Sequence, residues 1–223
     1  MDFGNIIQLA AISALPLLFA ITLSEAARGH AAFWLGDKTG WSQGRMTWNP
    51  TNHISPMETV VIPLVMFLAT SGSFVFGSAK PIPIDYRNVR EPKKHSAIWI
   101  EIASPIALFV MALVWYLVLI ALQFFQIDEP FFKGTGSAGV RVCLSLFAFQ
   151  LLPVPPLAGG RILLFSLPQK YAVQLARIEP WSIWIILLLA VAGIIGPLWI
   201  APIFSISLSV LKLLTSPLTL LLN

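Results

Sequence analysis

Charged residues are scarce in this chain. Only 11% of its 223 residues are charged and 57% are hydrophobic, whereas a soluble domain carries roughly 25% charged residues. So few charges cannot keep the surface of a soluble enzyme hydrated, and the composition also excludes a disordered tail or a coiled coil. We therefore expect an integral membrane protein, with residues 1–223 forming a single membrane domain.

Cysteine is almost absent, which excludes further classes of protein. The one cysteine, Cys143, excludes a disulfide framework and a cysteine-rich zinc or iron–sulfur cluster. Because it lies in an apolar run, we expect a buried thiol. The net charge of +4 is small and forms no clustered basic face, so nucleic acid is excluded as a partner. Such a charge fits loops near lipid headgroups instead.

Long apolar runs are abundant, and they predict the fold class. A membrane-spanning helix needs roughly 20 mostly apolar residues. Six runs approach or exceed that length, at residues 6–23, 59–76, 97–125, 140–167, 183–200 and 203–222. The fourth is predicted to be broken, since three prolines and two glycines lie between positions 153 and 160. We therefore expect an all-α integral membrane protein with about six transmembrane helices.

The segments between the runs predict a local strand and an orientation. Residues 44–49 alternate in the manner of a short strand or re-entrant segment after the first helix. Residues 80–94 hold five basic side chains, which by the positive-inside rule places this loop and both termini in the cytoplasm. The expected location is a multi-pass position in a bacterial-type inner or plasma membrane.

The first helix carries two charges at membrane depth, Glu25 and Arg28. Such charges are rare and are functional candidates by default. A zinc hydrolase helix uses His-Glu-x-x-His, in which the two histidines share one face and bind the metal while the glutamate acts as general base. Here the frame is SEAAR, residues 24–28. Glu25 stands in the correct position, and Ser24 and Arg28 replace the histidines.

The sequence around this frame resembles the site-2 protease family (peptidase M50), in its short branch that lacks a PDZ domain. The similar segments occur in the family's order: EAARGHAAFWLGDKT (25–39), GRMTWNP (44–50), HISP (53–56), AKPIPI (79–84), ASPIAL (103–108) and LLPVPPLAGGR (151–161). The resemblance covers about residues 10–170, with additional C-terminal helices over about 181–222. It implies a membrane-embedded protease fold whose members bind zinc through two histidines and an aspartate.

The three implied ligand positions are Ser24, Arg28 and Ala158 in this chain. A serine hydroxyl is a poor zinc ligand, alanine has no donor atom, and arginine stays protonated. We therefore expect zinc to be absent, with Glu25 remaining as a vestigial general base. Ser104 and Gln150 also depart from the family pattern. This combination predicts a pseudoprotease that keeps the scaffold and has lost its active site.

The two charges of the first helix also have a structural interpretation. Glu25 and Arg28 are three residues apart on one helix face, and we expect an ion pair in which Arg28 fills the vacated metal position. The alternative is that either side chain contacts a partner helix, a lipid headgroup or solvent. His30, His53 and His95 are considered as a relocated metal site, but ordinary interfacial histidines are expected. Glu101 is expected to be an interfacial or snorkelling carboxylate.

Three functions remain open on the sequence alone. The favoured one is an inactive homologue that serves as an accessory, structural or regulatory subunit. It would lie in membrane lipid and bind other transmembrane proteins in a larger complex. The alternative is an active intramembrane metalloendopeptidase with a rebuilt metal site. A transport or channel role is least favoured, because the sequence shows neither internal repeats nor a chain of intramembrane ionisable residues.

Overall fold

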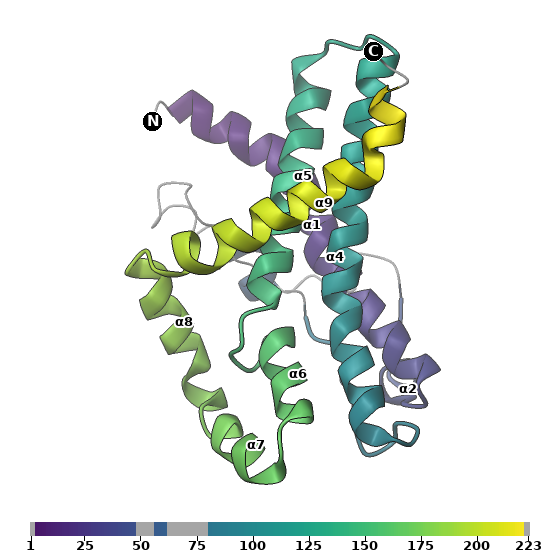
Figure 1. The fold of residues 1–223 in the computed structure, drawn as a ribbon, viewed down its shortest axis with the longest axis vertical. Coiled ribbons are helices and arrows are strands. Elements are labelled where there is room, and N and C mark those ends of the chain that lie inside the picture. Colours follow the sequence, from purple (N-terminus) through teal and green to yellow (C-terminus); the bar gives the residue numbers. More distant parts are fainter. Residues whose placement is uncertain (1–2, 48–55, 62–79, 221–223) are drawn as a thin grey trace.

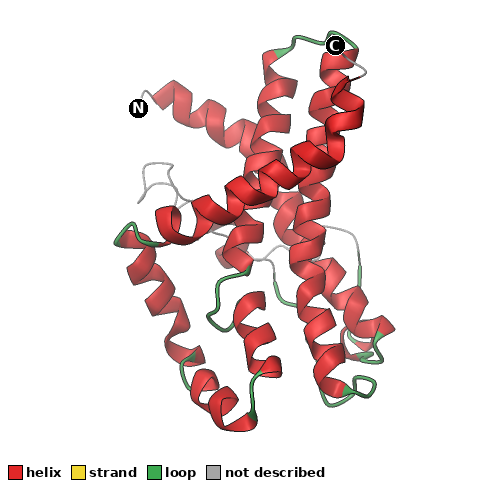
Figure 2. Cartoon of the chain, viewed as in Figure 1, coloured by secondary structure: helices red, strands yellow, loops and turns green. Residues whose placement is uncertain are grey.

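The structure is a computed structural model that describes residues 3–47, 56–61 and 80–220. Every regular element in these ranges is a helix, as Figure 2 shows. Residues 44–47 form no strand, and the rest of the predicted strand lies outside the described residues. Most of the predicted second span also lies outside them, with a short π-helical turn, η2 (Pro56–Val61), at its start.

Three long helices form the body of the protein: α1 (Phe3–Trp34), α4 (Lys93–Phe124) and α5 (Pro130–Gln150). α4 packs against both of the others. Their shared core is built mostly from small and aliphatic side chains, namely Ala20, Ile21, Leu108, Ala112, Val140, Cys143, Leu144 and Leu146. The sequence prediction that Cys143 is a buried thiol is confirmed. Small side chains let membrane helices approach closely, so packing holds this body together.

The predicted break in the fourth apolar run is confirmed. α5 ends at Gln150, a loop follows, and α6 begins at Ala158 and ends at Ser166. The loop folds back so closely that a Cβ atom on Gly159 would collide with the backbone of Leu151, and one on Gly160 with the backbone of Pro155. The glycines are therefore required by this close approach, independently of any role for Ala158.

The helices of the C-terminal part begin and end at other residues than the predicted runs 183–200 and 203–222. After α7 (Gln169–Ala176) and the short helix η3 (Glu179–Trp181), α8 covers Ser182–Val191. A π-helical turn, η4 (Gly196–Ile200), then runs directly into α9 (Ala201–Leu220).

The predicted boundary between the runs 183–200 and 203–222 is thus wrong, because the interruption lies at residues 192–194 and the chain is helical through Pro197 and Pro202. Proline is tolerated in the first turn of a helix, where its missing N–H has no acceptor to lose. A π-helical turn also absorbs a local change in the hydrogen-bond pattern.

Three described helices are long and apolar enough to cross a membrane: Ala11–Trp34, Lys93–Phe124 and Gly196–Leu218. A fourth candidate is the bent pair Gln169–Trp181 and Trp184–Ala190, which meet at 70°. The predicted total of six is not reached within the described ranges. In Figure 1 the last span, α9, lies diagonally across α5 and α4. The helices α6, α7 and α8 lie below it, at the lower left of the view.

Candidate functional site: a buried charge cluster

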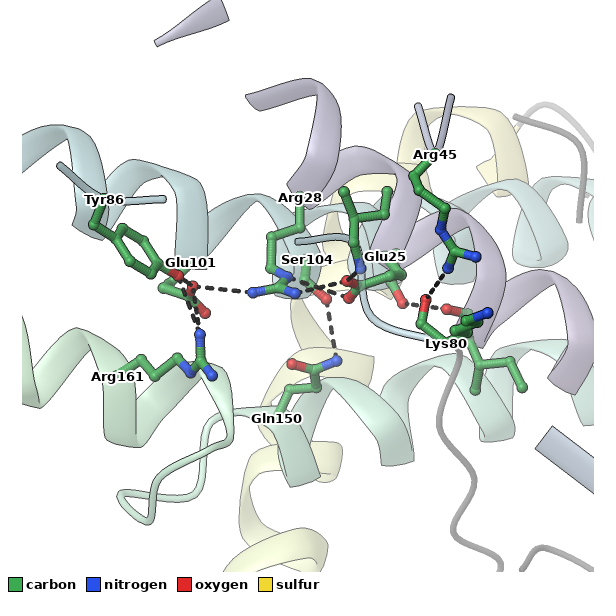
Figure 3. Close-up of polar contacts among 12 residues, drawn as sticks. Glu25, Arg28, Arg45, Lys80, Tyr86, Glu101, Ser104, Gln150 and Arg161 are labelled. Carbon is green, nitrogen blue, oxygen red and sulfur yellow. Dashed lines mark hydrogen bonds and ion pairs between the residues drawn. The ribbon is translucent and has the colours of Figure 1, made fainter. Parts of the chain in front are cut away.

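The Glu25 carboxylate and the Arg28 guanidinium face each other on α1 (Figure 3). Arg28 donates from Nη2 to Glu25 Oε1 at 2.6 Å and from Nε to Oε2 at 3.2 Å. The two side chains are only 15% and 11% exposed, for Glu25 and Arg28 respectively. The two parallel bonds fix both groups in one geometry. The structure therefore brings these two sequence-predicted residues together as a bidentate ion pair.

A second carboxylate reaches the same guanidinium from α4. Arg28 donates from Nη1 to Glu101 Oε1 at 3.3 Å, and the Glu101 side chain is 2% exposed. The expectation that Glu101 is an interfacial or snorkelling carboxylate is wrong. The signal was present in the sequence, because Glu101 is the only charge in the run 97–125, and a lone charge in an apolar span calls for a buried partner.

The cluster continues from Glu101 to α6. The Tyr86 hydroxyl donates to Glu101 Oε1 and accepts a bond of 3.2 Å from Arg161 Nη1, which itself lies 3.7 Å from the same carboxylate oxygen. At the outer end, Arg161 Nη2 lies 3.8 Å from Glu179 in η3. Burial, together with the nearby Glu101 charge, raises the pKa of Tyr86 to about 12, so its hydroxyl remains a donor at neutral pH.

The composition of this cluster explains how charges persist in an apolar body. Its centre contains two carboxylates, Glu25 and Glu101, and two guanidiniums, Arg28 and Arg161. The opposite charges balance, and each group has a hydrogen-bonding partner, which is the condition for burying ions without leaving one uncompensated. The cluster therefore links α1, α4 and α6 through side chains that are distant in sequence.

Glu25 also holds an extended loop against α1. The backbone N–H of Ile82 donates to Glu25 Oε1 at 2.7 Å. The Ile82 side chain lies against Gly29 of α1 and Gly40 of α2 (Thr39–Ser42), where a Cβ atom on either glycine would come too close to it. The Glu25 carboxylate thus accepts three donors, two from Arg28 and one from the loop. It acts here as a structural acceptor.

Asp37 fixes the same loop at a second point. Its side chain is 2% exposed and accepts the backbone N–H of Asp85 at 2.9 Å and that of Thr39 at 3.1 Å. A third tie runs from the Arg90 N–H to the Leu35 carbonyl at 2.8 Å. These bonds provide partners for backbone groups of the loop that would otherwise lack a hydrogen bond beside the helical body. They hold Tyr86, which follows Asp85, beside Glu101.

The three positions at which the family resemblance implies zinc ligands do not offer a metal-binding set. Ser24 is buried, and its hydroxyl donates to the Ile21 carbonyl of its own helix at 3.2 Å. Arg28 is committed to two carboxylates. Ala158 is buried at the start of α6, one turn before Arg161. A hydroxyl, a guanidinium and a methyl group do not fit a divalent zinc ion.

Two other positions that depart from the family pattern meet in space. Gln150, the last residue of α5, donates from Nε2 to the Ser104 hydroxyl on α4 at 3.1 Å. Ser104 is 1% exposed, so the amide removes what would be an unsatisfied buried hydroxyl. The Gln150 amide therefore joins the end of α5 to α4.

The histidines do not assemble within the described part of the chain. His30 donates from Nδ1 to the Ala26 carbonyl at 2.8 Å, His95 is exposed in the first turn of α4, and His53 lies outside the described residues. Among residues 3–47, 56–61 and 80–220, no group of three His, Cys, Asp or Glu side chains is arranged to hold a metal ion.

The helices and the charge cluster define an all-helical membrane protein with a buried polar centre. Over 180 residues, which is 78% of this chain and 78% of the relative, the sequence is 29% identical to a Bacillus subtilis (strain 168) protein described as "Putative zinc metalloprotease YwhC". This similarity supports the site-2 protease-like family indicated by the sequence motifs. No family model matches the chain, and no solved structure matches it significantly.

Proposed function

We propose that this protein is a catalytically inactive, site-2 protease-like membrane protein that binds other transmembrane proteins without cleaving them. It would act as an accessory, structural or regulatory subunit of a multi-pass complex in a bacterial-type inner membrane. The observation that carries the proposal is the position of Arg28. The family resemblance implies a metal ligand at this position, whereas the Arg28 guanidinium bonds to Glu25 and Glu101.

The chemistry of the cluster supports the loss of catalysis. A general base needs an activated water to deprotonate, and the proposed loss of the zinc ligands leaves none. The Glu25 carboxylate already accepts two N–H groups from Arg28 and one from Ile82. A fixed positive charge beside it also repels a dication. Under this proposal the protein holds no zinc.

The retained scaffold supports a binding role. The shape of the body is preserved without any ligand set by Gly159 and Gly160 in the first turn of α6, by the bond between Gln150 and Ser104, and by the anchored loop at Ile82. A membrane body maintained in this way has surfaces for neighbouring helices and lipid. The expected partners are therefore membrane lipid and other transmembrane proteins.

The deciding experiment is a metal and cleavage assay on the full chain, purified in mild detergent without chelators. We expect well under one zinc ion per chain by elemental mass spectrometry and no cleavage of a single-span reporter substrate. Glu25→Gln is the matched control. About one zinc per chain together with cleavage that disappears in the control would establish an active metalloendopeptidase with a rebuilt site and refute the proposal.

A further inference from the structure

α9 presents two different sides. Ser207, Leu211 and Thr215 are buried against the body, where α9 packs on α5 and α4. The opposite side is open, with Ile206 64% exposed and Leu213 73% exposed. The helix belongs to the span Gly196–Leu218, so its open side lies at membrane depth.

One charge lies on this helix outside the body. Lys212 is exposed, six residues before the end of the span at Leu218. No carboxylate lies within ion-pair distance of it in the described part of the protein. Placing an ammonium group in hydrocarbon costs roughly 2.5–3.5 kcal/mol or more, and such groups pair with a partner or reach the interface. Lys212 therefore either reaches the interface or takes a counter-charge from outside the described part of the protein.

The direction of the side chain favours a partner at membrane depth. Side chains of an α-helix tilt toward its N-terminus. Lys212 is closer to the C-terminal end of its span, at Leu218, than to the N-terminal end, at Gly196. Its side chain thus starts toward the middle of the bilayer, away from the nearer headgroups. Snorkelling to the nearer surface would require it to bend back.

The surface around Lys212 permits close contact. Ser205, Ser209, Lys212 and Ser216 follow one another at intervals of four, three and four residues, which places them along one side of α9. Each serine hydroxyl donates within its own helix, to the carbonyls of Pro202, Ser205 and Leu213 at 2.8, 2.9 and 2.9 Å. The hydroxyls are satisfied without a partner, and their small side chains leave room for a neighbouring backbone.

We infer that the Lys212 side of α9 docks a transmembrane helix of another protein that carries an aspartate or glutamate in its apolar stretch. The inference rests on the proposed binding function and names the chemistry of the partner. Charge complementarity favours a different protein over a second copy of this chain. The carboxylates inside its described candidate spans already have cations beside them: Glu25 and Glu101 pair with Arg28, and Glu179 lies 3.8 Å from Arg161.

The test uses the full chain in phosphatidylcholine vesicles with a fluorescent single-span peptide of leucine and alanine. One peptide carries a central glutamate and a matched one carries glutamine. Energy transfer should show that the wild-type chain binds the glutamate peptide about three- to twentyfold more tightly. Lys212→Met should abolish this preference and Lys212→Arg should retain it. Lys212→Glu should instead prefer a lysine peptide. Lys170→Met, at an exposed lysine of α7, is the matched control and should behave as wild type.

Three results would overturn the inference. The first is equal binding of the two peptides, which would leave lipid phosphate as the counter-ion of Lys212. The second is a preference that survives Lys212→Met, and the third is self-association of the chain that depends on Lys212. The zinc and cleavage assay reports on the proposed function separately. A zinc-free, inactive chain without the peptide preference would refute this inference alone, whereas zinc-dependent cleavage would refute the proposed function.

Discussion

Arg28 on α1 and Glu101 on α4 are 73 positions apart in the chain, and their side chains meet at 3.3 Å in the interior of the protein. Through this contact the helix that carries the SEAAR frame is joined to the helix with the most apolar of the described candidate spans. The guanidinium also binds Glu25, so one cation serves two carboxylates. Stability should therefore depend on Arg28 more than on any exposed arginine.

Removing the Arg28 guanidinium should destabilise the protein strongly. Arg28→Met leaves Glu25 and Glu101 without their shared cation in a site where both are largely buried. Breaking a buried ion pair in this way costs about 3–5 kcal/mol. The free energy of unfolding in detergent measures it. Arg87→Met is the control, because Arg87 is 88% exposed and bonds to Asp85 at the surface, and it should change stability by less than about 0.5 kcal/mol.

A compensated variant separates electrostatics from packing. Combining Arg28→Met with Glu25→Gln and Glu101→Gln removes all three charges, and we expect it to recover most of the lost stability. If the triple variant is as unstable as Arg28→Met, the packing of the long side chain would be the cause, and the ion-pair explanation would fail.

The first turn of α6, which packs against the preceding loop, should not tolerate a side chain at position 160. In Gly160→Ala the new Cβ would collide with the backbone of Val154 and Pro155, and backbone cannot move aside as a flexible side chain can. We expect a loss of about 1–3 kcal/mol, as for other overpacked sites. Gly196→Ala is the control, since a Cβ there meets nothing within 4 Å. Equal stability of the two variants would contradict the close approach.

Restoring the ligand types should restore metal binding if the scaffold is retained. The combined variant Ser24→His, Arg28→His and Ala158→Asp supplies two histidines four residues apart on one helix face and a carboxylate at the start of α6. We expect it to bind zinc, measured as metal content and as thermal stabilisation by added zinc that a chelator reverses. A folded variant without zinc would show that these three positions do not converge in this protein.

The Tyr86 phenol should lose its proton at a higher pH than an ordinary tyrosine. Its pKa is raised to about 12 by burial and by the Glu101 carboxylate, while a tyrosine in the unfolded chain has a pKa near 10. Because the native state then keeps a proton that the unfolded state loses, stability should fall as the pH rises from about 10 to 12. Ultraviolet absorbance of phenolate, compared between wild type and Tyr86→Phe, measures this. A titration step near pH 10 that the wild type shows and Tyr86→Phe lacks would contradict the buried contact.

Some of this arrangement could be predicted from local sequence. The scarcity of charge and the apolar runs indicated membrane helices, and the prolines and glycines after Gln150 indicated the break before α6, because both signals act over a few neighbouring residues. Glu25 and Arg28 could be paired in advance, since spacing along one helix fixes their relative position. The start of the last span was misplaced. A proline stops a helix only when it removes an N–H that would donate within the helix, and that depends on the position of the proline.

The sequence by itself determined the membrane class and the unusual charges of α1, and through its resemblance to the site-2 protease family it led to the prediction that Ser24, Arg28 and Ala158 replace metal ligands. Only the tertiary structure decided where those charges are neutralised. Glu101, Tyr86 and Arg161 come from three separate segments, and nothing in the spacing of distant residues specifies which will meet. That pairing follows from helix packing, which brings opposite charges together because leaving any one of them alone in the apolar interior would cost several kcal/mol (about 3–5).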